Sequence, residues 1–148
     1  QIGLEIDSWE VGMQNWTSGF EGEFCERTGY DLIKYLPAMT GKIVGSKEMT
    51  ERFLWDIRRV QADLLADNYY GEFRNLCNQY GLVSYCEPYD RGPMEELQIG
   101  SRVDGVMGEF WNGLSAIFQN NLMMRRTTKL ASSIAQRSES GGCRSIYF

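Results

Sequence analysis

The longest hydrophobic pattern in the chain begins after Ser46 and predicts an amphipathic helix. Apolar side chains recur every three or four residues, and the stripe ends near Gly81, a natural helix stop. The members of the stripe are Phe53, Ile57, Val60, Leu64, Phe73, Leu76 and Tyr80. A second helix is expected over residues 122–135, and shorter helical pieces are expected after Ser18 and over residues 30–39.

Three short apolar runs read as strands. They cover residues 2–6, 82–86 and 103–107, and each leads into a loop. The order is therefore strand, long helix, strand, loop, strand, helix. This order predicts an α/β fold with parallel strands joined by helical crossovers. No internal repeat or linker divides the chain, so a single unit is expected.

Composition and charge narrow the classes of partner. The chain has 148 residues, of which 43% are hydrophobic and 13% aromatic, as in a globular protein with a real core. Its net charge is −5, which argues against non-specific binding of nucleic acid or of anionic lipid. No apolar run approaches the roughly 18 residues that a membrane span needs. We therefore expect neither nucleic acid nor membrane as a partner.

The start of the chain bears on its localisation, and the absence of certain residue types bears on the kinds of site it can form. The opening QIGLEIDSWE has no initiator Met and no signal-like segment, so we interpret it as a missing beginning. Localisation in the periplasm, outside the cell or in the cytoplasm therefore stays undecided. The chain contains no histidine and no C-x-x-C pair, which excludes a zinc site of the usual spacing and a histidine-based triad. Carboxylates or hydroxyls must then carry any chemistry.

Glu10, Glu87 and Glu109 share one kind of position, because each follows a predicted strand and precedes a loop. Pro88 holds Glu87 in extended backbone at the end of LVSYC. In a (β/α)₈ barrel the carboxyl ends of the strands form the active face. Carboxylates beside aromatic rings suit proton transfer at a glycosidic bond, and clustered carboxylates also suit Ca²⁺. The plain alternative is that these acids are solvated loop residues and that Trp9 and Trp111 only pack.

Several blocks of the sequence together resemble glycoside hydrolase family 106, the α-L-rhamnosidases. The similarity runs from about residue 5 to about residue 112 and continues more weakly through KLASSIA. The blocks are DSWEVGMQNWTSGFEGEF, RTGYDLIKYLPAMTG, ERFLWDIRR, ADNYYGEF, CEPY and MGEFW. The resemblance implies a partial (β/α)₈ TIM barrel, about three β/α units of a larger catalytic domain. It also implies inverting hydrolysis of terminal α-L-rhamnosides and a calcium ion at the catalytic site.

The family blocks also imply roles for individual residues. Glu10 matches the acid of the D-S-x-E block, which makes it the expected general acid, and Glu109 is the other catalytic candidate. The expected substrate contacts are Asp7, Trp9, Glu87 and Trp111, and the expected calcium ligands are Glu87 and Glu109. The implied partner is a rhamnose-containing oligosaccharide or glycoside.

The chain departs from the family pattern in its last residues. A block similar to A-E-A-F-T, whose glutamate resembles the general base, is expected where the chain reads GGCRSIYF. Codons for Cys-Arg-Ser-Ile-Tyr, shifted by one base, can encode Ala-Glu-Ala-Phe. We therefore hypothesise that residues from about 136 to 148 are an out-of-frame tail of a barrel fragment that is inactive alone. The alternative is a non-catalytic carbohydrate-binding remnant protein.

Overall fold

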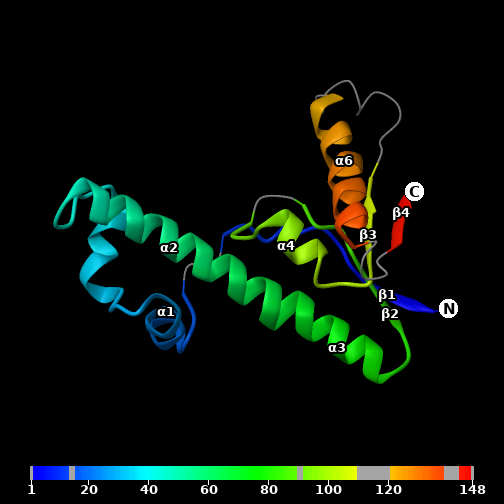
Figure 1. Cartoon of the computed structure of the whole chain (residues 1–148), viewed down its shortest axis with the longest axis horizontal. Helices are drawn as coiled ribbons and strands as arrows, with labels where there is room; N and C mark the ends of the chain where they lie inside the picture. The colour runs from blue at the N-terminus through cyan, green and yellow to red at the C-terminus, as the bar shows by residue number, and fades with distance from the viewer. Residues whose placement is uncertain (1, 14–15, 90–91, 110–120, 139–143, 148) are drawn as a thin grey trace.

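A four-stranded parallel sheet forms the centre of the computed structural model, which describes residues 2–13, 16–89, 92–109, 121–138 and 144–147. The strands follow one another in chain order, β1-β2-β3-β4, and every neighbouring pair is parallel (Figure 1). Their bounds are β1 Gly3–Ile6, β2 Val83–Cys86, β3 Gly105–Gly108 and β4 Arg144–Tyr147. The expected α/β class is confirmed, and the three predicted strands form within about two residues of their predicted positions.

Helices occupy the connections between the strands. Those before β2 are α1 Phe20–Thr28, η1 Ile33–Thr40, α2 Lys47–Leu65, η2 Ala66–Gly71 and α3 Glu72–Gln79. After β2 come α4 Glu96–Gly100 and α6 Asn121–Ser138. The segments α2, η2 and α3 follow one another without a break and form the long rod drawn diagonally in Figure 1. This rod is the long helix that the hydrophobic stripe predicts.

A side-chain cap explains where the longest α-helix begins. The Ser46 side chain accepts a hydrogen bond from the Met49 amide at 3.2 Å and caps α2. The helix expected after Ser18 forms as α1, although the capping-box spacing Ser18-Gly-Phe-Glu21 that predicts it is not used: Gly19 is the N-cap and no side chain bonds there. The helix α4 lies in a stretch expected to be a loop, since five residues are too few to show a helical period.

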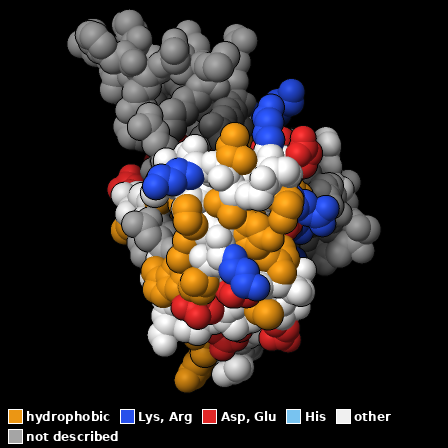
Figure 2. Space-filling model, turned by 90° about the vertical axis from the view of Figure 1, so that its left-hand side faces the viewer, with side chains coloured by type: hydrophobic (Ala, Val, Ile, Leu, Met, Phe, Trp, Pro, Cys, Tyr) orange, Lys and Arg blue, Asp and Glu red, His pale blue; other side chains and the backbone are white. Residues whose placement is uncertain are grey.

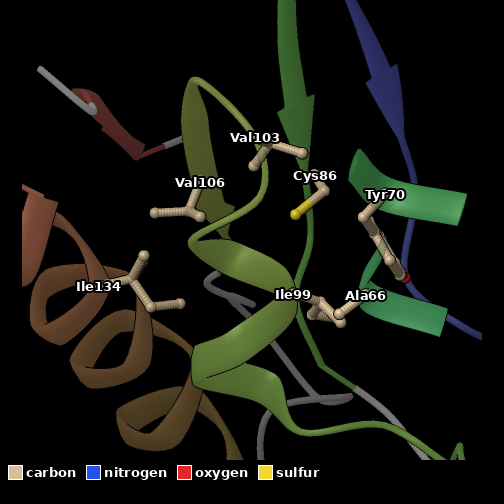
Figure 3. Close-up of a cluster of buried hydrophobic side chains, with 8 residues drawn as sticks. Ala66, Tyr70, Cys86, Ile99, Val103, Val106 and Ile134 are labelled. Carbon is tan, nitrogen blue, oxygen red and sulfur yellow. The ribbon is translucent and has the colours of Figure 1, made fainter. Parts of the chain in front are cut away.

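Two separate hydrophobic cores hold the molecule together. The sheet core lies between the strands and the helices η2, α4 and α6, and its side chains point toward one another in Figure 3. It contains Ala66, Tyr70, Cys86, Ile99, Val103, Val106, Ala131 and Ile134. The helical core joins α1, η1 and the first part of α2, and contains Phe20, Phe24, Leu32, Ala38, Phe53, Ile57 and Val60.

The surface over the helical end of the molecule is partly apolar. Figure 2 looks at that end and shows hydrophobic side chains grouped among scattered charges. Exposed apolar side chains in this part of the chain include Ile33, Met39 and Ile43. Within the described ranges, no helix combines the length and the hydropathy that a membrane crossing needs.

Candidate functional site

Strand alternation divides the side chains of the sheet between two faces. Cys86 points into the sheet core, so Glu87, the next residue, belongs to the opposite face. The same rule places Glu5 and Asp7 opposite Ile6, which packs against the sheet core. Ile6 pairs with Cys86, and the Glu87 amide donates to the Ile6 carbonyl at 3.1 Å. The register therefore brings Asp7 beside Glu87 at the carboxyl ends of β1 and β2.

Three carboxyl groups converge on this face of the sheet. One carboxylate oxygen from each of Glu5, Asp7 and Glu87 lies within 4.8 Å of the other two. Glu87 is only 7% exposed, and its Oε2 atom has no hydrogen-bond partner among the described residues. A buried carboxylate oxygen without a partner is costly, and in a native protein it calls for an unobserved ligand, ion or water.

Burial and mutual repulsion change the ionisation of this cluster. Burial is the largest cause that raises the pKa of Glu87 to about 7, and the Asp7 and Glu109 carboxylates add to the rise. Loss of solvent likewise raises the pKa of Glu5, again with help from Asp7 and Glu109. Glu87 is therefore about half protonated at neutral pH, which lowers the repulsion between the crowded carboxylates.

Glu109 and Tyr89 extend the cluster. Glu109 directly follows β3, as Glu87 directly follows β2, and its carbonyl accepts a hydrogen bond from the Thr127 hydroxyl of α6 at 2.9 Å. Tyr89 is 5% exposed. Burial, followed by the nearby Glu87 and Glu109 carboxylates, raises the pKa of Tyr89 well above its ordinary value. The Tyr89 hydroxyl lies close to these carboxylates, but in this part of the structure its geometry satisfies no hydrogen bond.

Glu10 is placed differently from the other two predicted glutamates. The residue that directly follows β1 is Asp7, and Glu10 lies three residues farther along, exposed in the loop. Glu10 is outside the group of three carboxyl groups. Its expected role as general acid therefore stays a prediction, as do the roles of Glu87 and Glu109. Trp111 lies outside the described residues.

Trp9, in the loop that follows β1, packs against the loop that follows β2. Its indole N–H donates to the Gly12 carbonyl at 2.6 Å, and its amide donates to the Tyr89 carbonyl at 3.3 Å. A side chain at Gly92 would place Cβ 2.6 Å from the indole ring, so only glycine fits there. The Tyr69 ring meets Trp9 edge-on, with ring centroids 6.0 Å apart. Trp9 therefore holds the loop that carries Glu10 in place through contacts within the protein.

Sequence reasoning missed Glu5 and recognised Tyr89 only as an aromatic residue beside Glu87. Glu5 lies two residues before Asp7 on the same strand, and the two-residue period of a strand would have placed both on one face. Tyr89 follows Glu87 by two residues in the same extended segment. The interpretation of the site concentrated on residues after the strands, so it overlooked an acid within the strand itself.

Comparison with known proteins assigns this chain to a family. The model of glycoside hydrolase family 106, described as alpha-L-rhamnosidase, matches residues 3–137. A rhamnosidase structure from Novosphingobium sp. PP1Y superposes with a TM-score of 0.75 and 32% identity, covering 90% of this chain and 13% of that chain. A protein of Formosa agariphila, provisionally named beta-glucuronidase, is 54% identical over 108 residues.

The match with the Formosa protein covers 73% of this chain but only 9% of that protein. This chain therefore spans a small part of the length of both relatives. The family model nevertheless matches most of the chain, including the strands β1, β2 and β3 that carry the carboxylate cluster. The chain belongs to glycoside hydrolase family 106.

Proposed function

We propose that this chain forms part of the active face of a (β/α)₈ barrel that hydrolyses terminal α-L-rhamnosides with inversion. The observation that carries the proposal is the carboxylate cluster at the carboxyl ends of parallel strands, where such barrels place their active sites. Four parallel strands in chain order, with helices between successive strands, suit a segment of such a barrel. Membership of the rhamnosidase family supports the choice of sugar.

Glu10 and Glu109 are the catalytic candidates. In an inverting hydrolysis the acid gives its proton to the leaving oxygen while a base activates water on the opposite face of the sugar, with the two carboxyls about 6.5–9.5 Å apart. An exposed loop position leaves the Glu10 carboxyl open to a substrate arriving from solvent. Glu109 raises the pKa of both Glu5 and Glu87, as a neighbouring negative charge does, and also suits a role in holding the sugar or an ion.

The residues present fit a calcium ion, and they offer more oxygen ligands than the expected pair Glu87 and Glu109. Glu5, Asp7 and Glu87 offer hard oxygen ligands, and Glu87 Oε2 lacks a partner within the described chain. Glu109 stays a proposed ligand beside them. A bound Ca²⁺ would supply positive charge that orients sugar hydroxyls, while the protein residues bind the ion and exclude water from Glu87.

Ion binding can be tested on the chain itself with terbium luminescence. Tb³⁺ should bind to the 148-residue chain, be displaced by Ca²⁺, and bind more weakly below pH 7, because Glu87 must lose its proton first. Glu87→Gln should weaken binding at least 10-fold, whereas Glu26→Gln, at an exposed position on α1, should leave the affinity unchanged. Equal affinity in the two variants would contradict the site.

Catalysis needs the rest of the barrel, and the chain alone should release no rhamnose from an aryl α-L-rhamnoside. The matched segment of the Novosphingobium rhamnosidase can be replaced by residues 3–137 of this chain. Activity in this chimera should fall about 100-fold or more with Glu10→Gln and stay unchanged with Glu26→Gln. A folded chimera that binds rhamnose without hydrolysing it would favour the carbohydrate-binding alternative. Cleavage of an aryl β-glucuronide instead of the rhamnoside would contradict the rhamnoside substrate and favour the activity for which the Formosa protein is named.

The reading frame of the last residues is a separate prediction. The family match stops at residue 137, and β4 then pairs with β3 where the glutamate-bearing strand is expected. We expect resequencing of the coding DNA to reveal a one-base slip between about residues 130 and 141. The corrected frame would read Ala-Glu-Ala-Phe and place a glutamate on the strand beside β3. A sound frame through these codons would contradict the slip and leave the base to another residue.

A further inference from the structure

A pocket lies between the loop that follows β1 and the helical rod, and Trp9 is one of its lining residues. Its volume is about 520 Å³, within the range of pockets that bind small molecules. The loop after β1 and the start of α1 form one wall, and the rod formed by α2 and η2 forms the other. Trp9 contributes to this pocket and also precedes Glu10 directly, so the pocket is continuous with the loop that carries the expected acid.

Two aromatic rings remain half exposed in the pocket walls. Trp16 is 49% exposed and Tyr69 is 46% exposed. Neither ring is loose: Trp16 meets Phe20 edge-on at 5.6 Å, and Tyr69 meets Trp9 edge-on at 6.0 Å. Aromatic faces that are fixed in place but not covered suit the C–H face of a pyranose ring, which stacks on them.

The polar groups of the pocket favour a neutral ligand with hydroxyl groups. Gln61 and Asn68 line the rod side, and each amide offers both donors and an acceptor. The only charged residue among the described lining residues is Glu23, which bonds Arg27 at 3.4 Å. This environment accepts the hydroxyls of a neutral sugar and disfavours an anion such as a uronate.

A π-helical turn forms part of the rod side of the pocket, next to residues of α2. The turn η2 interrupts an otherwise α-helical rod, and such turns often occur at functional sites. It places Asn68 and Tyr69 at the pocket while Tyr70, the next residue, is fully buried in the sheet core. The sheet core therefore fixes the position of the pocket wall.

We propose that this pocket is the leaving-group subsite, which binds the neutral pyranose ring to which the rhamnose is attached. The inference rests on the proposed function, because it takes Glu10 as the acid. When the glycosidic C–O bond breaks, the Glu10 proton passes to the leaving oxygen, while water forms the new bond to the rhamnose carbon and gives up one proton to the carboxylate base. The leaving sugar must then lie beside Glu10, and Trp9 connects Glu10 to this pocket.

The indole N–H signals of the full chain in ¹⁵N-correlated NMR spectra provide the test. The probes are L-rhamnose, glucose and α-L-rhamnosyl-(1→6)-glucose. Glucose and the disaccharide should shift the signal of Trp16, and the disaccharide should bind more tightly than either L-rhamnose or glucose alone. Trp16→Ala should weaken disaccharide binding about 2- to 10-fold, the range for one aromatic contact. The matched control is Trp55→Ala, which removes a 61% exposed indole from a neighbouring hollow and should leave the affinity unchanged.

The outcomes separate this proposal from the rhamnosidase proposal. Equal losses of affinity in Trp16→Ala and Trp55→Ala, or no response of Trp16 to either glucose-containing probe, would overturn the subsite. If Trp16 responds to glucose while the disaccharide binds no better than glucose, the pocket is supported as a sugar subsite and the rhamnoside substrate is contradicted.

Discussion

The helical core and the carboxyl ends of the sheet differ in how completely they satisfy their buried polar groups. In the helical core, Tyr30 donates to Asp56 at 3.0 Å, and the Thr50 hydroxyl bonds the carbonyls of Val44 and Ser46. In the sheet half, four buried polar atoms have no partner within the described residues. They belong to Tyr70, Glu87, Tyr89 and Gln98.

The difference teaches where to look for function. Both regions bury large apolar side chains, so packing alone does not distinguish them. A folding unit gains stability when every buried donor and acceptor is paired, and an unpaired group is retained at a cost. In this chain those costs fall in the sheet half: Glu87 and Tyr89 follow β2 beside the carboxylate cluster, whereas Tyr70 lies on η2 and Gln98 on α4. A ligand that pairs with these groups would bind there with a favourable free energy.

The largest expected effect comes from breaking the helical core. Phe53 is fully buried and packs against Phe24 and against Tyr35, whose ring is stacked at 5.5 Å. Phe53→Ala should lower the free energy of unfolding by about 3–5 kcal/mol, measured by urea titration with circular dichroism. Trp55→Ala on the same helix should cost about 0.5 kcal/mol or less, because that side chain is exposed.

The same variant tests whether the two regions are independent. Phe53 belongs to the helical core and Glu87 to the strand ends, so Phe53→Ala should leave the terbium affinity of the folded chain unchanged. A weaker affinity in the folded variant would show that the helical core positions the carboxylates, and the comparison between two separate regions would fail.

Glu87 gives the next largest effect, and its sign depends on pH. Its pKa of about 7 in the folded chain lies above its ordinary value, so its protonated form stabilises the fold at low pH. That contribution is complete below about pH 4.5 and disappears as the pH rises through about 7. Without calcium, Glu87→Gln should therefore be more stable than the parent chain at pH 8, by up to about 2 kcal/mol, and nearly equal to it at pH 5.

Thermal unfolding in a chelator at both pH values measures this difference. Glu51→Gln, at an exposed position on α2, should show no such dependence on pH. If Glu87→Gln were less stable than the parent chain at pH 8, the Glu87 carboxylate would have to be paired within the protein. The conclusion that Glu87 Oε2 lacks a partner at the strand ends would then be wrong.

The sequence predicts the helical region and the strand positions better than it predicts the site. A long apolar stripe specifies one face of the rod, and short runs before Glu87 and Glu109 specify strands, because both patterns are local. The group of Glu5, Asp7 and Glu87 depends on the register between β1 and β2, which are far apart in the chain. Local periodicity carries no such register, so Asp7 was predicted and Glu5 was not.

The clamped position of Trp9 was also beyond prediction from the sequence. Its contacts come from Gly12, Tyr69 and Gly92, which lie on three separate segments. The π-helical turn that presents Tyr69 leaves no periodic signal of its own, because it is a single turn that falls between Leu64 and Phe73 of the stripe. The aromatic residues were therefore recognisable as candidates, but their division between packing and the pocket required the structure.

The smallest expected effect compares Tyr30, a partly buried residue that packs on the helical core, with Tyr70, a fully buried residue of the sheet core. Tyr30→Phe removes a hydrogen bond to the nearly buried Asp56 and should cost about 1–2 kcal/mol, since Arg52 still pairs with Asp56 at 3.4 Å. Tyr70→Phe removes a fully buried hydroxyl that has no partner in the described chain, and should stabilise the fold by about 0.5–1 kcal/mol. Both substitutions delete one oxygen and keep the ring, so urea titrations of the two variants isolate the polar term. Equal destabilisation would mean that the Tyr70 hydroxyl is paired in solution, and unpaired polar groups would then no longer distinguish the sheet half from the helical core.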